Sequence, residues 1–280
     1  MIDLHTHSTA SDGTMSPSEL VHYARERALE AISLTDHDTV EGVEEALAAG
    51  NKEGIEVVPG IEISAEHPGG TLHIAGYFID INDPDFLRNI AVLQKARAER
   101  NPRIVHKLQQ LGLDITYDEI KEEAETGQVG RPHFAQVMLK KGYIKKPQEA
   151  FDKYLKKGAP AYEDKFRFPP DEAIAHIVNA GGIAVLNHPV TLNCRNTREL
   201  ESFLETLLPY GLGGVEAYYS DHNPQQAEMY RKIAEKHGLL VTGGSDFHGK
   251  NIKGIDLGTG RGNLNIPYSV LESIKKALAA

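Results

Sequence analysis

The sequence predicts an α/β protein: a seven-stranded sheet, closed or nearly closed into a barrel and interrupted by an all-helical insertion. Seven short apolar segments alternate with amphipathic segments of helical period over most of the 280 residues, which is typical of a parallel sheet covered by helices. Between residues 83 and 165 this alternation stops, and apolar residues recur only at helical spacing. Imidazoles and carboxylates follow nearly every expected strand, where such barrels gather their reactive groups.

The first part of the chain contains four expected strands and two expected helices. Ser16, Pro17 and Glu19 mark a helix start, because a serine cap followed by proline, with glutamate three residues after the cap, forms a capping box. In chain order the segments are strand 2–5, helix 17–30, strand 31–35, helix 39–54, strand 55–64 and strand 71–79.

The insertion is expected to be helical throughout. Its first segment has an apolar stripe at helical spacing with no strand after it, formed by Leu87, Ile90, Leu93, Ile104, Leu108 and Leu111. Further helices are expected at 117–125, 132–142 and 147–155. The chain is therefore predicted to consist of barrel residues 1–82, a substrate-binding or lid insertion at 83–165, and barrel residues 166–280.

After the insertion the alternation of helix and strand returns. The expected segments are helix 170–182, strand 183–189, helix 197–208, strand 214–219, helix 224–238 and strand 239–249. These three strands bring the total to seven.

Composition excludes several classes of function. The net charge is −10 and no run is dense in lysine or arginine, which disfavours double-stranded DNA as a partner because such binding needs clustered cations. The single cysteine, Cys194, excludes an intrachain disulfide and cysteine-based zinc knuckles. No apolar run approaches the roughly 20 residues of a membrane span, and Met1 leads into an apolar strand without a signal-peptide pattern. We expect a cytoplasmic protein without membrane contact.

The residues with metal-binding side chains fall at the ends of the expected strands. In chain order they are His5, His7, Asp12, His37, Glu62, His73, His188, Asp246 and His248. Alternate residues of a strand point to the same side, so His5 and His7 can bind one ion together. Imidazole and carboxylate donors without thiolate favour Mn, Fe or Zn. Nine donors exceed the need of one ion, so a multinuclear site is expected, which would hold a phosphate and supply a bridging hydroxide.

Five motifs in this order, DLHTHSTASDG, SLTDHDT, PGIEIS, NHP and SDFHG, together resemble the PHP (polymerase and histidinol phosphatase) superfamily of metal-dependent phosphoesterases. The resemblance implies a distorted (β/α) barrel of PHP type with three divalent ions, for which Mn is preferred over Fe or Zn. By position it implies the ligands His5, His7, Glu62 and Asp246 for the first ion, Asp12, His37 and His248 for the second, and His73 and His188 with bridging Glu62 for the third.

The motifs GRPHFAQVMLKKGY and YYSDHNPQQ are similar to the branch of bacterial nucleoside 3′,5′-bisphosphate phosphatases and related 5′→3′ exonucleases of short RNA. Arg131 and His133 stand at an expected helix start, where a guanidinium, an imidazole and free backbone N–H groups can bind a second phosphate. His222 follows the sixth strand and is expected to face the same cleft. Tyr162 and Lys165, at the return to the barrel, are weaker candidates.

The expected activity is hydrolysis of the 3′-phosphate of nucleoside 3′,5′-bisphosphates such as 3′-phosphoadenosine 5′-phosphate, with 5′-phosphorylated short RNA as a further substrate. A metal-bridging hydroxide would attack phosphorus in line with the ester oxygen while the cations neutralise the other oxygens. A metal-bound water, Asp246 or His222 would protonate the leaving oxygen, and all three alternatives stay open.

Three alternative functions compete with this one. Histidinol-phosphate phosphatase shares the fold, but the long insertion and the expected anion site argue against it. A metal-dependent amidohydrolase commonly has a carboxylated lysine as bridging ligand, and here Glu62 occupies the equivalent position. A non-catalytic nucleic-acid-binding module is disfavoured by the net charge of −10 and by the complete set of ligands.

Overall fold

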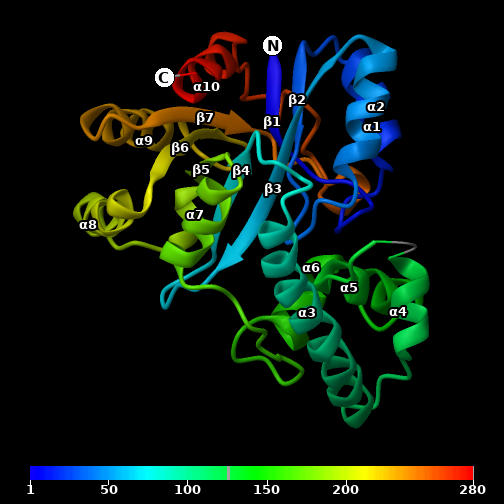
Figure 1. The fold of residues 1–280 in the computed structure, drawn as a ribbon. Coiled ribbons are helices and arrows are strands. Elements are labelled where there is room, and N and C mark those ends of the chain that lie inside the picture. The colour runs from blue at the N-terminus through cyan, green and yellow to red at the C-terminus, as the bar shows by residue number, and fades with distance from the viewer. Residues whose placement is uncertain (125–126, 280) are drawn as a thin grey trace.

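The computed structural model describes residues 1–124 and 127–279, and its centre is a seven-stranded sheet curved into a nearly closed barrel (Figure 1). Neighbouring strands follow one another in chain order. They are β1 (Ile2–Thr6), β2 (Ala31–Leu34), β3 (Glu56–Ala65), β4 (Leu72–Tyr77), β5 (Ile183–Leu186), β6 (Leu212–Tyr219) and β7 (Leu240–Gly244). Each strand overlaps its expected range, and the expected seven-stranded α/β barrel is confirmed.

Helices cover the outside of the barrel and one of its ends (Figure 1). They are α1 (Pro17–Glu26), α2 (Val43–Glu53), α7 (Pro170–Asn179), α8 (Thr197–Leu207), α9 (Pro224–Lys236) and α10 (Ser269–Leu278), with short 3₁₀ turns η2 (Pro189–Leu192), η3 (Leu208–Tyr210) and η4 (Gly249–Asn251). The expected capping box is present, since Ser16 Oγ accepts from Glu19 N at 3.2 Å and Glu19 Oε2 accepts from Ser16 N at 2.8 Å. Among the described residues, none of the helices combines the length and apolarity needed to cross a membrane.

Strand β4 runs against the expected direction. It pairs antiparallel with both β3 and β5, whereas the other neighbouring strands are parallel. The connection between β3 and β4 spans only residues 66–71, which is too short for the crossover of about a dozen residues that parallel neighbours need. The prediction of an all-parallel sheet is therefore wrong at β4. This reversal puts His73, which faces Ser64 of β3, at the end of the barrel where the parallel strands finish.

Contacts between the first and last strands nearly close the barrel. The N–H of His7 donates to the carbonyl of Phe247 at 2.9 Å, and the N–H of Asp246 donates to the carbonyl of His5 at 2.9 Å. A Cβ at Gly244 would overlap with the Cβ and backbone nitrogen of His5, so glycine is needed where β7 approaches β1. This closure brings the first and last metal-ligand motifs of the sequence side by side.

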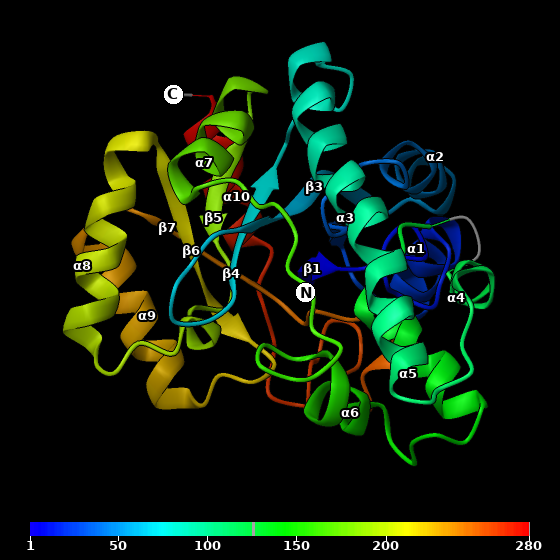
Figure 2. The same ribbon diagram turned by 90° about the horizontal axis from the view of Figure 1, so that it is seen from below.

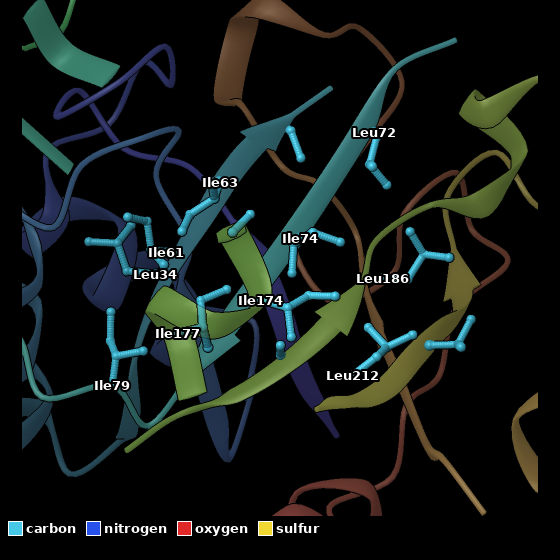
Figure 3. Packing of buried hydrophobic residues seen from close by; sticks show 14 of the residues in the cluster. Leu34, Ile61, Ile63, Leu72, Ile74, Ile79, Ile174, Ile177, Leu186 and Leu212 are labelled. Atoms are coloured by element: carbon cyan, nitrogen blue, oxygen red, sulfur yellow. The ribbon is translucent and has the colours of Figure 1, made fainter. Parts of the chain in front are cut away.

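The main hydrophobic core lies between the sheet and the helices outside it. In Figure 3, Ile174 and Ile177 of α7 pack over Ile74 of β4 and Leu186 of β5. Burial of each side chain of this size stabilises the fold by roughly 1.5–3 kcal/mol relative to exposure. The core therefore provides a rigid support for the side chains at the strand ends.

The segment between β4 and α7 is helical, as expected. Its elements are α3 (Pro84–Gln110), α4 (Tyr117–Glu123), α5 (Arg131–Lys140), α6 (Pro147–Ala150) and the π-helical turn η1 (Phe151–Leu155), and residue 125, where the second expected helix ends, lies outside the described residues. These helices lie at the end of the barrel opposite α10 (Figures 1 and 2). They share a hydrophobic cluster that includes Ile104, Phe134 and Leu155, whereas Phe86 and Ile90 at the start of α3 belong to the barrel core.

Candidate metal centre and the adjoining cavity

The structure brings all nine predicted metal ligands together at one end of the barrel. His5, His7, Asp12, Glu62, His188, Asp246 and His248 are at most 9% exposed, and His37 and His73 are partly buried. We refer to these nine residues as the ligand cluster. Four overlapping groups within it have donor atoms that all lie within 4.8 Å of one another, and these groups are His7–Asp12–His37–His248, His5–His188–Asp246, His5–His7–Glu62 and His37–Glu62–His73.

Glu62 of β3 stands at the centre of the ligand cluster. Its Oε1 lies 3.2 Å from His5 Nε2 and 3.0 Å from His188 Nε2. Its Oε2 lies 2.8 Å from His37 Nδ1 and 3.2 Å from His73 Nδ1. One carboxylate therefore contacts four imidazoles from four separate segments of the chain, which is the placement expected of a bridging ligand.

Asp246 and Asp12 occupy the other side of the cluster. Asp246 Oδ1 is 3.0 Å from His7 Nε2, and Asp12 Oδ1 is 3.3 Å from His248 Nε2. The rings of His7 and His248 stack with centroids 4.1 Å apart. His7 is shared between two of the four overlapping groups: one with His5 and Glu62, as the family resemblance implies for the first ion, and one with Asp12, His37 and His248, the residues implied for the second ion.

Several buried polar atoms of the cluster lie close to one another but are not in hydrogen-bond geometry with any described residue. They include both ring nitrogens of His7, Nδ1 of His37, Oε2 of Glu62 and Oδ1 of Asp246. Unpartnered buried polar atoms are costly, and a cation between these atoms would satisfy them. Burial and the neighbouring His248 and His37 rings lower the pKa of His7 to about 3, so this imidazole is neutral and able to bind a metal ion. The donor set thus fits divalent cations.

Two residues of the ligand cluster have left-handed backbone conformations that non-glycine residues seldom adopt. The φ angle is 28° at His188 and 57° at Asp246. Such conformations cost on the order of 1–3 kcal/mol each. They persist because His188 N donates to Glu216 Oε2 at 2.7 Å and Asp246 N donates to the carbonyl of His5.

Two carboxylates outside the predicted ligand set orient the ligands. Glu216 of β6 accepts from His5 Nδ1 at 2.9 Å in addition to its bond with His188 N, which fixes the ring of His5. Asp36 accepts from Ser8 N at 2.8 Å and from Ser11 Oγ at 2.5 Å, and so organises the loop that carries Asp12. A charged residue within the apolar segment GVEAYY was the available signal for Glu216.

A cavity of about 1000 Å³ opens beside the ligand cluster, with Asp12, His37 and His73 in its wall. Seven cationic side chains line other parts of this wall. Besides the exposed Lys156 and Lys157 they are Arg97, Arg100, Arg131, Lys165 and Arg167, and we call these five the cationic lobe. Only Arg131 and Lys165 among them were predicted from the sequence. Arg97 and Arg100 lie within α3, where nothing in the local pattern separates a cavity-lining arginine from a solvated one.

Asp38 anchors the lobe next to the ligand cluster. Its Oδ2 accepts from Arg97 Nε at 2.9 Å and from Lys165 Nζ at 2.8 Å. Arg97 and Lys165 hold the pKa of the buried Asp38 carboxyl well below its usual range against the opposing effect of burial. Because Asp38 directly follows His37, the positive charges start next to the ligand cluster.

Arg100 is the most unusual member of the lobe. It is 2% exposed, and its guanidinium donates to Asn101 Oδ1 at 3.1 and 2.7 Å. Among the residues that the structure describes, no carboxylate forms an ion pair with it. Burial and the charges of Arg97 and Arg131 lower its pKa. A buried cation without a counter-ion is unfavourable, so the lobe is suited to receive an anion.

The three residues expected to bind a second phosphate have different positions. Arg131 lines the cavity, donates to the carbonyl of Glu163 at 2.9 Å, and lies over the ring of Tyr162. His133 is 5% exposed and lies outside the cavity wall, where its Nδ1 accepts from Gly130 N at 2.9 Å. His133 has no direct access to the cavity, and its role in phosphate binding stays a prediction.

His222 is also outside the cavity wall. It is 5% exposed, its Nδ1 donates to the carbonyl of Ala217 at 2.9 Å, and its ring lies between those of Tyr219 and Tyr230. Tyr219 Oη donates to Asp246 Oδ2 at 3.2 Å, so the tyrosine rather than the imidazole reaches the ligand cluster.

Comparison with known proteins agrees with this arrangement. The sequence model of the PHP domain matches residues 3–162. A 5′–3′ exoribonuclease of Haemophilus influenzae is 35% identical over 265 residues, covering 91% of this chain and 95% of the relative. A 3′,5′-nucleoside bisphosphate phosphatase of Chromobacterium violaceum is 32% identical over 258 residues, covering 92% and 90%.

Solved structures show the same fold. A protein of Bifidobacterium adolescentis, described as a metal-dependent phosphoesterase, superposes with a TM-score of 0.87 at 31% identity, and the match covers 98% of this chain and 94% of the other. The family match, the relatives and the fold agree with the geometry of the ligand cluster. The chain belongs to the PHP domain family and is a phosphoric ester hydrolase.

Proposed function

We propose that this enzyme removes the 3′-phosphate of nucleoside 3′,5′-bisphosphates, such as 3′-phosphoadenosine 5′-phosphate, and also cleaves 5′-phosphorylated short oligoribonucleotides. The observation that carries the proposal is that the ligand cluster and the cationic lobe line the same cavity. One site suits a phosphate under attack and the other suits a second phosphate that is only bound. The relatives named as a bisphosphate phosphatase and an exoribonuclease support the same substrate class.

The ligand cluster would hold three divalent cations, and its nine imidazole and carboxylate donors without thiolate suit Mn, Fe or Zn. The family resemblance favours Mn among these. When bound, the cations would neutralise the phosphate oxygens and generate the nucleophile from water. In the reaction the oxygen of water forms a bond to phosphorus, the bond from phosphorus to the 3′-oxygen breaks, and that oxygen takes up a proton.

The cationic lobe would hold the 5′-phosphate. Arg100 has no carboxylate partner among the described residues, so a phosphate would supply its missing counter-ion. Arg131 is fixed on its inner side by Glu163 and Tyr162 and leaves part of its guanidinium on the cavity. With the 5′-phosphate in the lobe, the 3′-phosphate would lie over His37 and Asp12 at the mouth of the ligand cluster.

Among the expected proton donors, Asp246 and His222 receive little support from the geometry. Despite burial, His5 and His248 hold the pKa of Asp246 well below its usual range, which leaves it as an acceptor for Tyr219. His222 is enclosed by two tyrosine rings. We therefore assign protonation of the leaving oxygen to water in the cavity.

We also propose that the domains expected from the sequence have separate roles. Residues 1–82 and 166–280 would form the catalytic barrel, and residues 83–165 would form the substrate-binding insertion. Arg97, Arg100 and Arg131 all lie on helices of this insertion.

Phosphate release by the purified, Mn²⁺-loaded protein tests the proposal. We expect turnover of 3′-phosphoadenosine 5′-phosphate to adenosine 5′-phosphate, with far slower release from histidinol phosphate, whose amino group five neighbouring cations would repel. His5→Ala, checked for folding by circular dichroism and for metal content, is the control. Release no faster than this control, or preference for histidinol phosphate or an amide substrate, would reject the proposal.

A further inference from the structure

The cavity has a second wall that the proposed bisphosphate does not use. It is formed by the tip of the β3–β4 connection, residues 66–71, together with Asn193 and Phe203 of the neighbouring segments. In Figure 2 this connection lies on the side of α8, whereas α3 lies on the other side of the barrel end. Apart from the exposed Glu66, this wall has no charged side chain, in contrast to the cationic lobe.

Two rings form the surface of this wall. The centroids of His67 and Phe203 are 4.9 Å apart, and the ring planes meet at 68°. His67 Nδ1 accepts from Gly69 N at 3.2 Å and from Gly70 N at 3.1 Å, which fixes the orientation of the imidazole. Both rings line the cavity and remain partly exposed to it. We call this pair the aromatic wall.

The aromatic wall is tied to the ligand cluster through Thr191. The N–H of Thr71 donates to the carbonyl of Thr191 at 2.9 Å, and Thr191 Oγ1 donates to the carbonyl of Thr71 at 2.8 Å. His188 Nδ1 donates to the same Thr191 Oγ1 at 3.0 Å. The position of the loop tip is therefore fixed relative to the His188 side of the cluster.

The three parts of the cavity follow one another in a defined order. The cationic lobe adjoins His37 through Asp38, and the aromatic wall adjoins His188 through Thr191. The ligand cluster lies between them, because Glu62 contacts both His37 and His188. A chain with its 5′-phosphate in the lobe and its first internal phosphate at the cluster would therefore continue toward the aromatic wall.

We infer that His67 and Phe203 form a stacking platform for the base of the second nucleotide of a 5′-phosphorylated oligonucleotide. The inference rests on the proposed function and names its substrate class, which is a chain of at least two nucleotides. The bisphosphate is the equivalent substrate without a second nucleotide. A cavity of about 1000 Å³ is at the upper end of the about 300–1000 Å³ usual for ligand pockets, which suits more than one nucleotide. Aromatic rings without nearby cations recognise bases by stacking rather than phosphates by charge.

The reaction on such a chain is the same as on the bisphosphate. Water adds to the internal phosphate, the bond from phosphorus to the 3′-oxygen of the first nucleotide breaks, and that oxygen takes a proton. The products are a nucleoside 5′-monophosphate and a chain shortened by one nucleotide that keeps its 5′-phosphate. The second base remains on the aromatic wall throughout, so it contributes to binding rather than to the chemical step.

Fluorescence of 2-aminopurine in metal-free protein tests the platform without any turnover. A 5′-phosphorylated trinucleotide with 2-aminopurine at the second position should lose fluorescence on binding, because stacking on an aromatic ring quenches it. Phe203→Ala and His67→Ala should abolish this quenching. Phe203→Tyr, which keeps a ring at the same place, should retain it, and Tyr210→Ala, which removes an aromatic residue 49% exposed outside the cavity wall, should not change it.

Turnover by the metal-loaded enzyme gives the second measurement. Loss of stacking should lower kcat/KM for a 5′-phosphorylated dinucleotide about tenfold or more, mainly through KM, while turnover of the bisphosphate stays within about twofold. An abasic second position should make wild type and Phe203→Ala equal. Undiminished quenching in both alanine variants, or equal losses on dinucleotide and bisphosphate, would overturn the inference. Failure of wild type to hydrolyse either substrate would instead reject the proposed function, and the fluorescence result would stand independently.

Discussion

The ligand cluster and the cationic lobe line one cavity, yet they are built in different ways. Residues of the cluster come from or directly follow β1, β2, β3, β4, β5 and β7, and the barrel core fixes these strands. The lobe comes from helices α3 and α5 and from residues 165–167 on the return to the barrel. Imidazoles in the cluster face carboxylates at close range, whereas Arg100 in the lobe has no carboxylate partner among the described residues.

In the proposed function, this difference separates the residues of the chemical step from those that recognise the substrate. Donors placed on a closed barrel keep the spacing that several cations require, because neighbouring strands restrain each ligand. Cations placed on an inserted helical segment can change with the substrate without disturbing that spacing. Hydrogen bonds from Gln128 Nε2 to the carbonyl of His37, and from Gln136 Nε2 to Asn251 Oδ1, connect the inserted segment to the barrel. Because the barrel supports the ligand cluster and the inserted helices support most of the cationic lobe, a substitution in one should leave the function of the other measurable.

The largest effect is expected from Glu62→Gln, which acts on the cluster alone. Glutamine has no anionic oxygens to offer to cations held among the four imidazoles around Glu62. Metal binding and bisphosphate hydrolysis should therefore fall by about 10³-fold or more. Metal analysis and phosphate release measure this. Glu56→Gln, which affects a glutamate paired with Lys275 away from the cavity, should behave as wild type. A Glu62→Gln enzyme with full metal content and activity would contradict the assignment of Glu62 as a bridging ligand.

Arg100→Met should affect the lobe alone. Loss of a charged hydrogen-bond donor to the 5′-phosphate should raise KM for the bisphosphate by about 10- to 100-fold. Hydrolysis of a nucleoside 3′-monophosphate, which lacks the 5′-phosphate, should not change, and neither should metal content. Arg88→Met, on the exposed side of the same helix, is the control. Equal losses on both substrates would show that Arg100 does not recognise the 5′-phosphate.

Glu216→Gln tests the support behind the cluster. Removal of the negative charge that orients His5 Nδ1 and holds His188 N should weaken metal affinity by about 10- to 100-fold. Added Mn²⁺ should restore most of the activity, because the nine ligands themselves are unchanged. Titration of activity against metal concentration measures the shift, and KM for the 5′-phosphate group at saturating metal should stay at the wild-type value. Activity independent of the metal concentration would argue that Glu216 has no such role.

The smallest effect is a pH dependence confined to the lobe. Burial, opposed by Asp38, lowers the pKa of Lys165 to about 7. Below this pH the ammonium is charged and adds to the attraction of the 5′-phosphate, and above it the charge is lost. We expect the ratio of kcat/KM for the bisphosphate to that for the 3′-monophosphate to fall by no more than about tenfold as the pH rises above 7. Lys165→Arg should remove this fall. If the ratio falls equally steeply with pH in both enzymes, Lys165 is not the group responsible.

The different construction of the ligand cluster and the cationic lobe also explains how much of the site could be predicted. Side chains at strand ends are revealed by their place in the sequence, because a short apolar strand followed by histidine or aspartate is a local pattern. His5, His7, Glu62, Asp246 and His248 were all predicted in this way, and the structure places them together. Arg97 and Arg100 were missed because they lie inside a long polar helix, α3, where arginine is common on the solvated face. The charge of Glu216 within the apolar segment GVEAYY was a visible signal, but its role follows only from its partners His5 and His188.

The sequence also did not reveal the direction of every strand or how the barrel closes. The alternation of apolar segments predicted seven strands, but only the six-residue connection before β4 decides that this strand is reversed. Without that reversal His73 would lie at the opposite end of the barrel. Helix α10 was not predicted, although its buried Leu271 and Ile274 pack into the cluster that includes Val58 and Ala75 of the barrel.

By itself the sequence determined the strands, the nature of the metal-binding side chains and their attachment to strand ends, because these depend on local periodicity and on residue chemistry. Only the tertiary structure decided which donors lie close enough to share an ion and which cations face the cavity. Those relations join residues as far apart as His5 and Asp246, or Asp38 and Lys165. Distances between such residues depend on how the barrel closes and where the inserted helices pack, and no local pattern encodes either.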